Sequence, residues 1–508
     1  MIPLLSEFEA RLLDESTIKS DYLSEHQLME NAGRKSAEFI MENIADPFRK
    51  QILIIAGKGN NGGDGIVIHF HLCRYGVDST LLLLAKEQTD RDLFKRYQIN
   101  LDTVDIYDGE LILDKFDLVV DALFGIGLTR DVRGMYRELI QLMNRHDHVI
   151  AVDMPSGILT DSGREAGVAV QADYTLTMGF AKYGHFLNDG LKNSGELHVL
   201  DIGFQALSPE DVQVTAISTK EIEDILRPFS VDTHKYKRGK VLSMCGSPGM
   251  TGAAILSIQA AYRSGCGMVR ALVPNALNPI FETRLVETIT LPVLDDPPGH
   301  WCSAHAGIIS KLIPDHEALI CGPGLGNQEN IPHLVAEVLH ASQNIAVVLD
   351  ASGFTALTEK VIRFDQLPRD IVLTPHQGEY ARLFDCTVDE LQEDPIAHLQ
   401  SQQRRLQGRV LVLKGAPTLI LLSSGKIRLL DQGNPLLATA GTGDILAGLI
   451  GGFLAQGYSP DDAAVLGVYF HGEAAQLFLD IYGTRGMIAS DLLQLLPEVF
   501  PGVGNDAY

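Results

Sequence analysis

The chain has 508 residues, which is too long for one hydrophobic core and predicts about two to four domains. Its formal net charge of −24 opposes general binding to nucleic acid or to an anionic membrane, so local N–H groups and a few cations must hold any anionic ligand. The N-terminus lacks the features of a signal peptide, no uncharged apolar run reaches the roughly 18 residues of a membrane span, and the cysteines have no disulfide or zinc spacing, so we expect a cytoplasmic protein.

Short apolar runs alternate with amphipathic segments in the first half of the chain. Residues 24–44 predict a helix, because Leu28, Ala32 and Ser36 recur along one face. The apolar runs are short and β-rich, and their spacing leaves room for crossover helices; they cover 51–56, 79–85, 117–123, 148–152, 174–178 and 197–202. This pattern predicts a mostly parallel sheet with helices on both faces.

The first glycine-rich loop follows the run 51–56 and has the sequence GKGNNGGD at 57–64. Such a loop exposes backbone N–H groups at a helix N-terminus, where a phosphate can bind, and the glycine spacing matches the dinucleotide fingerprint. Asn60, Asn61 and Asp64 are too polar for a simple turn. Their side chains can contact hydroxyls or amides of a ligand, or a cation.

Aspartates end two later strands of the predicted sheet, Asp121 before the glycine-bearing segment FGIG at 124–127 and Asp153 before Met-Pro-Ser-Gly. The ends of parallel strands meet at one edge of a sheet, where ligands bind. Asn61, Asp121 and Ser156 could there supply oxygen ligands to a weakly hydrated monovalent cation, which leaves Asp153 for proton transfer. An aspartate at a strand end also serves as a helix N-cap, so each residue alone is ambiguous.

Four motifs resemble the YjeF N-terminal family, namely LMENAG at 28–33, GKGNNGGD at 57–64, DALFGIG at 121–127 and VDMPSG at 152–157. The resemblance implies a Rossmann-like three-layer α/β/α sandwich over residues 1–217 with NAD(P)H-hydrate epimerase activity. It places Asp153 at the reacting ring and potassium at Asn61, Asp121 and Ser156. The implied substrate-binding residues are Asn60, Asn61, Gly62, Gly63, Asp64, Gly125, Ile126, Gly127, Leu128, Thr129, Arg130, Asp131 and Asp153.

Some members of this family are mRNA-decapping scaffolds that have lost catalysis. The retained Asp153 and the intact NNGGD at 60–64 argue against that loss here.

A second α/β series follows a lapse of the apolar pattern, which places the domain boundary near 215–222. Helices are predicted over 249–265, 443–455 and 461–479. Strands are predicted over 240–245, 268–273, 317–321, 345–350, 371–374, 409–413 and 417–422.

The second glycine-rich loop, AGTGD at 440–444, lacks the Lys-Ser/Thr of a Walker motif. Its N–H groups can form an anion hole at the start of a helix, where Asp444 can take a proton from an attacking hydroxyl. Lys414 ends a strand and suits a nucleotide phosphate, although it could be a solvated surface charge. His376 and Glu379 open a helix, where they could act only as caps.

Together with GSPGMTG at 246–252, GPGLG at 322–326 and THKYKRG at 233–239, these motifs resemble the YjeF C-terminal family. The resemblance implies a ribokinase-like α/β fold over 222–505 that acts as an NAD(P)H-hydrate dehydratase, with magnesium held through nucleotide phosphates and water. The resemblance also implies that Asp444 is the catalytic residue and that Ala253, Gly324, His376 and Asp444 would contact the hydrated dinucleotide. The implied nucleotide-binding residues are Lys414, Gly415, Ala416, Pro417, Thr418, Asn434, Thr439, Ala440, Gly441, Thr442 and Gly443.

The two resemblances together imply repair of hydrated NADH or NADPH. The first domain would interconvert the R and S epimers, and the second would dehydrate the S form at the expense of ADP, giving AMP and phosphate, with ATP as an alternative donor. We expect a homo-oligomer with no nucleic-acid or membrane partner. A rival interpretation is a small-molecule kinase fused to a non-catalytic dinucleotide-binding or oligomerisation module, which would have no need of Asp153.

Overall fold

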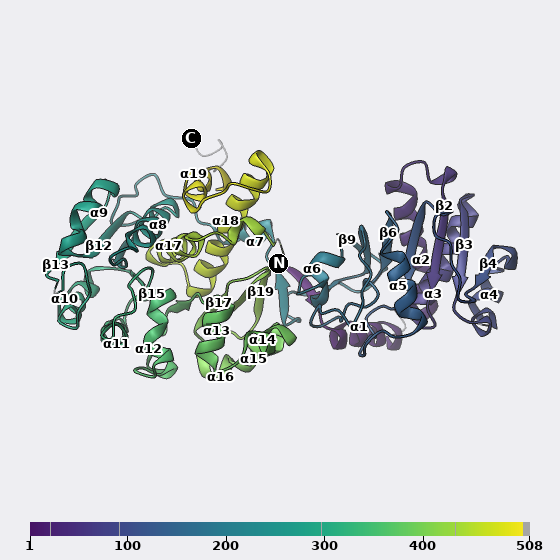
Figure 1. The fold of residues 1–508 in the computed structure, drawn as a ribbon, viewed down its shortest axis with the longest axis horizontal. Coiled ribbons are helices and arrows are strands. Elements are labelled where there is room, and N and C mark those ends of the chain that lie inside the picture. Colours follow the sequence, from purple (N-terminus) through teal and green to yellow (C-terminus); the bar gives the residue numbers. More distant parts are fainter. Residues whose placement is uncertain (21, 91, 296, 432, 501–508) are drawn as a thin grey trace. The chain divides into compact units, whose positions relative to one another are not determined.

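The computed structural model describes residues 1–20, 22–90, 92–295, 297–431 and 433–500. The chain divides into two compact units, one of Pro3–Val214 and one of Met1–Ile2 together with the chain from Thr215 onward (Figure 1). The predicted end of the second domain at residue 505 lies outside the described residues. Among the described helices, none combines the length and the apolar character needed to cross a membrane.

The sheet of the N-terminal unit is parallel throughout and, within the described residues, has the strand order β4-β3-β2-β5-β6-β7-β9. The strands are β2 (Gln51–Ala56), β3 (Asp78–Leu83), β4 (Val104–Ile106), β5 (Leu118–Ala122), β6 (Val149–Val152), β7 (Tyr174–Met178) and β9 (Glu196–Leu200). All the strands predicted for this half are present, whereas the short edge strand β4 lacks a sufficient apolar run and escaped prediction.

Helices cover both faces of this sheet, as the sequence predicts. Ile52 and Ile54 enter the core on one face, which they share with Ala37 of α2, while Leu53 and Ile55 enter the core on the other face, which they share with Leu139 of α5. The helices are α1 (Glu7–Lys19), α2 (Glu25–Asn43), α3 (Asn60–Tyr75), α4 (Asp92–Tyr97), α5 (Met135–Met143) and α6 (Gly190–Asn193).

Helix α1 was not predicted from the sequence. Ser6 caps it and forms a capping box with Glu9, which also accepts a hydrogen bond of 2.8 Å from the Tyr183 hydroxyl. The preceding strand β1 (Ile2–Leu5) pairs in parallel with β8 (Ala181–Lys182). The large apolar side chain of Phe8 is 72% exposed, so the apolar residues of α1 do not mark a single buried face. Tertiary contacts rather than apolar periodicity therefore decide where this helix lies.

The sheet of the C-terminal unit has the order β13-β12-β11-β14-β15-β16-β17-β18-β19 among its described strands. Pairing is parallel as far as β17 and antiparallel from β17 through β18 to β19. The strands are β11 (Lys240–Met244), β12 (Met268–Pro274), β13 (Ile289–Val293), β14 (Ala318–Cys321), β15 (Ala346–Leu349), β16 (Ile371–Leu373), β17 (Val410–Leu413), β18 (Thr418–Leu421) and β19 (Ile427–Leu430); β10 (Val214–Ala216) spans the division between the units. The predicted strands are all found, and β13 and β19 were missed.

Helix α17 (Thr442–Ala455) is central to this unit and is buried along most of its length. It packs so closely on α8 (Thr251–Arg263) that a Cβ at Gly448 would lie 2.1 Å from the carbonyl oxygen of Ser257, so this position requires glycine. The other helices are α7 (Thr219–Ile225), α9 (Asn278–Arg284), α10 (His305–Leu312), α11 (Ile331–Ala341), α12 (Thr355–Thr358), α13 (Gln377–Phe384), α14 (Val388–Glu393), α15 (Pro395–Ser401), α16 (Gln403–Leu406), α18 (Pro460–Tyr482) and α19 (Ala489–Val499). This burial fixes the direction in which the N-terminus of α17 points.

Candidate active sites

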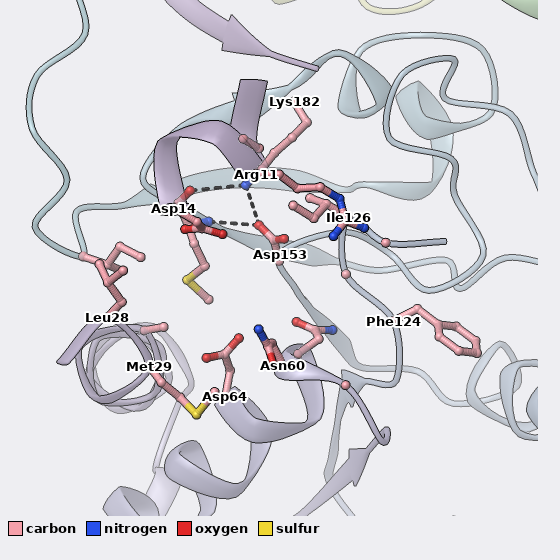
Figure 2. A pocket seen from close by; sticks show the side chains of 18 of the residues that line it. Arg11, Asp14, Leu28, Met29, Asn60, Asp64, Phe124, Ile126, Asp153 and Lys182 are labelled. Carbon is pink, nitrogen blue, oxygen red and sulfur yellow. Dashed lines mark hydrogen bonds and ion pairs between the residues drawn. The ribbon is translucent and has the colours of Figure 1, made fainter. Parts of the chain in front are cut away.

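The N-terminal unit contains a pocket of about 440 Å³ at the carboxyl edge of its sheet (Figure 2). Helices α1 and α2, the first glycine-rich loop and the loop after β5 form its walls. Of the predicted substrate-binding residues, the pocket is lined by Asn60, Asn61, Asp64, Gly125, Ile126, Gly127, Leu128 and Asp153. Residues from four segments that are distant in the sequence therefore meet in one cavity.

The rest of the predicted set lies outside this lining. Gly62 is buried where α3 begins, and a Cβ there would lie 1.8 Å from the Gly57 carbonyl oxygen, so the tight loop requires glycine. Gly63 is buried beside it. Thr129, Arg130 and Asp131 are exposed, and Asp131 pairs with Arg133 at the surface. Their predicted contact with substrate stays a prediction.

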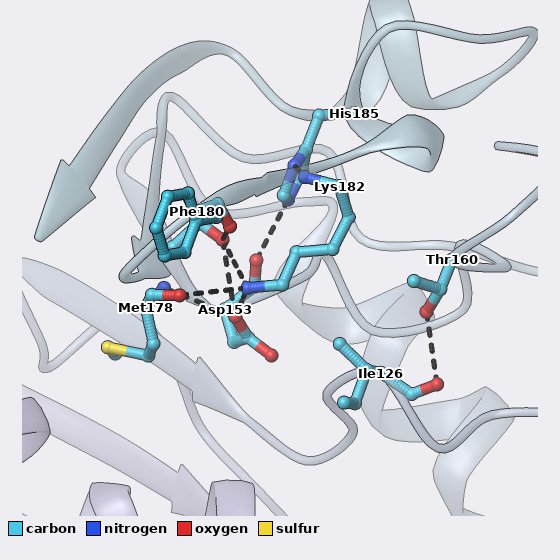
Figure 3. Close-up of polar contacts among 8 residues, drawn as sticks. Ile126, Asp153, Thr160, Met178, Phe180, Lys182 and His185 are labelled. Carbon is cyan, nitrogen blue, oxygen red and sulfur yellow. Dashed lines mark hydrogen bonds and ion pairs between the residues drawn. The ribbon is translucent and has the colours of Figure 1, made fainter. Parts of the chain in front are cut away.

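Asp153 follows β6 and enters the pocket from a left-handed backbone conformation, with φ of 66°. Its Oδ1 accepts hydrogen bonds from Lys182 Nζ at 2.5 Å, from Thr177 Oγ1 at 3.2 Å and from the Met178 backbone N–H at 3.2 Å (Figure 3). Burial alone would raise the pKa of Asp153, but the Lys182 charge and these hydrogen bonds outweigh it and hold the pKa below its usual value. The carboxyl group is therefore ionised and able to act as a base.

Lys182 was missed from the sequence, because a single lysine beside a short strand carries no pattern. Its side chain is only 4% exposed, and β8 delivers it to Asp153. His185 supports this arrangement: its Nδ1 accepts from the Lys182 backbone N–H at 3.0 Å, and its Nε2 donates to the Asp153 carbonyl oxygen at 2.9 Å (Figure 3). Burial, reinforced by the Lys182 charge, lowers the pKa of His185 to about 4, which keeps this tautomer neutral.

Asn61, Asp121 and Ser156 are brought together as predicted. Asp121 is fully buried and accepts hydrogen bonds from the Ser156 hydroxyl at 2.7 Å and the Ser156 backbone N–H at 2.8 Å. Ser156 Oγ in turn accepts from the backbone N–H of Phe124, and a Cβ on the next residue, Gly125, would lie 3.4 Å from Asn61 Cγ. Both polar atoms of the buried Asn61 amide lack a hydrogen-bond partner among the described residues.

The second site is built around the N-terminus of α17. Gly441 adopts a φ of 94° that only glycine adopts freely, and it starts the helix whose first turn contains Asp444. A Cβ on Gly443 would lie 3.3 Å from Lys414 Nζ, so the ammonium group lies beside the first turn of this helix. Exposed N–H groups and an ammonium side by side form a site for an anion.

Lys414 is not a solvated surface charge. Its ammonium lies 2.7 Å from Oδ1 of the buried Asp350 and 4.0 Å from Oε2 of Glu379, and Thr374 donates a further hydrogen bond to Asp350. Burial would lower the pKa of Lys414, but the charges of Asp350 and Glu379 raise it above its usual value. Asp350 follows β15, and its position at a strand end was the available signal that sequence reasoning did not use.

The other predicted dehydratase residues lie in the surrounding loops. A Cβ on Gly324 would lie 3.0 Å from Ala253 Cβ, so these two residues are neighbours. His376 caps α13 through its Nδ1, which accepts from the N–H groups of Gly378 and Glu379, and its backbone pairs with that of Lys414. Its ring remains half exposed, so capping and ligand contact are compatible.

The predicted nucleotide-binding residues fall into two segments. The turn between β17 and β18 together with the first residue of β18 contains Lys414, Gly415, Ala416, Pro417 and Thr418. The segment that leads into α17 together with the first two residues of that helix contains Asn434, Thr439, Ala440, Gly441, Thr442 and Gly443. Contact between Lys414 and Gly443 joins them. The Thr439 and Thr442 hydroxyls donate to carbonyl groups of their own segment, whereas the buried Asn434 Nδ2 has no hydrogen-bond partner among the described residues.

Asp444 is suited to accept a proton near neutral pH. Burial, together with the charge of Asp350, raises the pKa of Asp444 to about 7, although Lys414 opposes the shift. A base acts in its deprotonated form, so we expect kcat/KM of the dehydratase reaction to rise with pH through about 7 and then to level off. A rate that is flat between pH 6 and 8 would contradict this role, and Asp444→Asn should lose the dependence together with the activity.

Comparisons with known proteins cover both units. The family model for NAD(P)H-hydrate dehydratase matches residues 241–498, and the model for the YjeF-related protein N-terminus matches 25–184. A ribokinase-like superfamily protein from Enterococcus faecalis V583 is similar in structure, with a TM-score of 0.50 and 25% identity; the match covers 58% of this chain and 97% of that one. This similarity confirms the predicted ribokinase-like fold.

Two curated relatives match over nearly the full chain. A bifunctional NAD(P)H-hydrate repair enzyme from Moorella thermoacetica is 35% identical over 93% of this chain and 92% of its own length. A relative of the same name from Escherichia coli K12 is 31% identical over 94% of this chain and 90% of its own length. With both family models matched in the expected order, the chain belongs to the family of bifunctional NAD(P)H-hydrate repair enzymes.

Proposed function

We propose that this protein repairs hydrated NADH and NADPH with two active sites. The N-terminal unit interconverts the R and S epimers of the hydrate, and the C-terminal unit dehydrates the S epimer at the expense of ADP, giving AMP and phosphate. Family membership over both units supports this function, since both family models match along this chain and relatives similar over nearly its full length are named bifunctional NAD(P)H-hydrate repair enzymes. The observation that carries the first activity is the buried Asp153–Lys182 pair in a pocket.

The second site supports transfer of a phosphoryl group to the ring hydroxyl. Asp444 accepts the hydroxyl proton while the new oxygen–phosphorus bond forms and the terminal phosphate bond of the nucleotide breaks. Phosphate then leaves with the electron pair of the ring C–O bond, the adjacent ring carbon loses a proton, and the double bond returns. The N–H groups at the start of α17 and the Lys414 ammonium lie where the transferred negative charge would be stabilised.

Potassium fits the group of Asn61, Asp121 and Ser156. Burial raises the pKa of Asp121 to about 6, so an ionised Asp121 needs a positive charge nearby, and the unpartnered Asn61 amide offers an additional oxygen. One carboxylate with neutral oxygens suits a monovalent rather than a divalent cation. The described residues contain no cluster of three or more acidic, histidine or cysteine side chains for a metal. Magnesium would therefore enter the second site with the nucleotide phosphates.

Removing potassium should lower the thermal stability of the N-terminal unit and slow epimer exchange. In 100 mM KCl, against tetramethylammonium chloride at the same ionic strength, we expect a higher unfolding temperature and faster epimer exchange, because a ligand that binds the native state stabilises it. Asp121→Asn should abolish the potassium effect, whereas Asp105→Asn, at an exposed position of β4, should keep it. An equal potassium response in wild type and Asp121→Asn would contradict the assignment.

The whole function is tested by supplying mixed epimers of hydrated NADH together with ADP. We expect complete recovery of the NADH absorbance, since epimer exchange feeds the S form to the dehydratase. Recovery that stops when the S form is exhausted would refute the epimerase activity. Recovery that requires no nucleotide would refute the phosphoryl-transfer step, and a parallel reaction with ATP compares the two donors.

The rival interpretation, a kinase with a non-catalytic partner module, leaves the Asp153–Lys182 pair in its pocket without a role. Homo-oligomer formation and a cytoplasmic location stay predictions from the sequence.

A further inference from the structure

Asp14 of α1 brings a second carboxyl group into the epimerase pocket, where no sequence motif pointed. The pocket is lined by Asp14 as well as by Asp153 and Lys182. In Figure 2 the Asp14 and Asp153 carboxyl groups lie across the pocket from Asn60 and Asp64. Among the described residues no hydrogen bond or ion pair engages the Asp14 carboxyl group, in contrast to the neighbouring Glu15, which pairs with Lys19.

Contacts at the start of α1 hold Asp14 in the pocket rather than on a free helix surface. Strand β1 pairs with β8, the strand that contains Lys182, and the chain then turns directly into α1. The start of α1 is fixed by the Ser6 capping box and by the hydrogen bond from Tyr183 to Glu9. One local structure thus positions Asp14 together with Lys182 and, through it, with Asp153.

The two carboxyl groups have opposite electrostatic environments. Burial, and then the negative charge of Asp153, raise the pKa of Asp14 to about 6, while Lys182 holds the pKa of Asp153 low. The charged groups that act on Asp14 are Asp153, Lys182, Arg11 and Glu25. Two titratable groups whose pKa values are driven apart in one pocket divide naturally into an acid and a base.

Epimer exchange needs an acid and a base. Water adds to an enamine so that the hydroxyl group joins the carbon next to nitrogen, and inversion there requires the C–O bond to break and to form again on the other face. The departing oxygen keeps the bonding electron pair and needs a proton, while the ring nitrogen donates its lone pair to form a C=N bond. The returning water must lose a proton as the C=N electrons move back to nitrogen.

We propose that Asp14 is a second catalytic residue of the epimerase, which protonates the departing ring hydroxyl while Asp153 accepts the proton of the water that returns. In each exchange the departing water takes one proton from Asp14 and the returning water gives one proton to Asp153, so nothing is oxidised or reduced. Proton exchange with solvent then returns the pair to protonated Asp14 and ionised Asp153 before the next turnover, because the pKa of Asp14 is the higher of the two. This inference rests on the proposed epimerase function of the pocket.

The test is the variant Asp14→Asn, which keeps the shape of the side chain but cannot donate a carboxyl proton. We expect kcat for epimer exchange to fall about 10²–10⁴-fold with KM little changed. In wild type the exchange rate should decline as pH rises above about 6, because Asp14 loses its proton, and Asp14→Asn should lack that decline. Asp14→Glu should recover part of the rate.

Glu15→Gln is the matched control, since it removes the adjacent acid of the same helix from a solvent-exposed ion pair. It should exchange epimers at the wild-type rate, and all variants should keep dehydratase activity with the pure S epimer. If Asp14→Asn exchanges epimers within twofold of the wild-type rate, or more slowly but with the same decline above pH 6, Asp14 is not the acid. Either result would leave the proposed epimerase function standing. A wild type that exchanges epimers no faster than buffer would instead refute the proposed function and this inference with it.

Discussion

Asp444→Ala should abolish restoration of the reduced cofactor while epimer exchange continues at the wild-type rate. Loss of a general base costs about 10²–10⁴-fold in rate, because the ring hydroxyl then keeps its proton as it attacks the phosphoryl group. The measurement is recovery of NADH absorbance from the S epimer with ADP, alongside the exchange of epimers in the same preparation. Loss of both activities would contradict two independent active sites.

Stability separates a catalytic effect of this substitution from misfolding. The folded-state pKa of Asp444 is raised, so the folded wild type binds its proton more tightly and loses stability as pH increases from about 4 to 7. Asp444→Ala removes that loss, and we expect it to be at least as stable as wild type at pH 8. The matched control is Asp462→Ala, which removes a first-turn aspartate from the neighbouring helix α18 and should keep dehydratase activity.

Asp153→Ala should reduce epimer exchange to the rate without enzyme, while the dehydratase still consumes the S epimer. The substitution also leaves the buried Lys182 ammonium without its partner, which costs about 3–5 kcal/mol in the free energy of unfolding. Exchange is measured by converting pure R epimer and trapping the S form with the dehydratase reaction. Unchanged exchange in a folded Asp153→Ala protein would exclude Asp153 as the base.

A double variant distinguishes lost chemistry from lost stability in this pocket. Asp153→Ala combined with Lys182→Met removes both buried charges, so we expect much of the stability to return without any epimer exchange. Recovery of exchange in the double variant would show that Asp153 only stabilises the fold.

The family resemblance and the local sequence pattern together predicted most of the frame of both sites. The short apolar runs identify the strands, and since parallel strands end at one edge, Asp121 and Asp153 were expected near the first glycine-rich loop. The second glycine-rich loop predicted an anion site and Asp444 as a base at the start of a helix, and these roles stay predictions. The edge strands β4 and β13 and the helix α1 escaped because their apolar patterns are short or interrupted by exposed side chains.

The sequence pattern by itself predicted the alternating strands and helices, the glycine-rich loops and the carboxylates at the strand ends, because each of these is encoded in a contiguous stretch, while the family resemblance implied the two named folds. Only the tertiary structure supplied Lys182 as the partner of Asp153, 29 residues away, and Asp350 as the partner of Lys414, 64 residues away. It also carried Asp14 into the epimerase pocket. Pairing of buried charges depends on which segments the fold places together, and that information is absent from any short stretch of the chain.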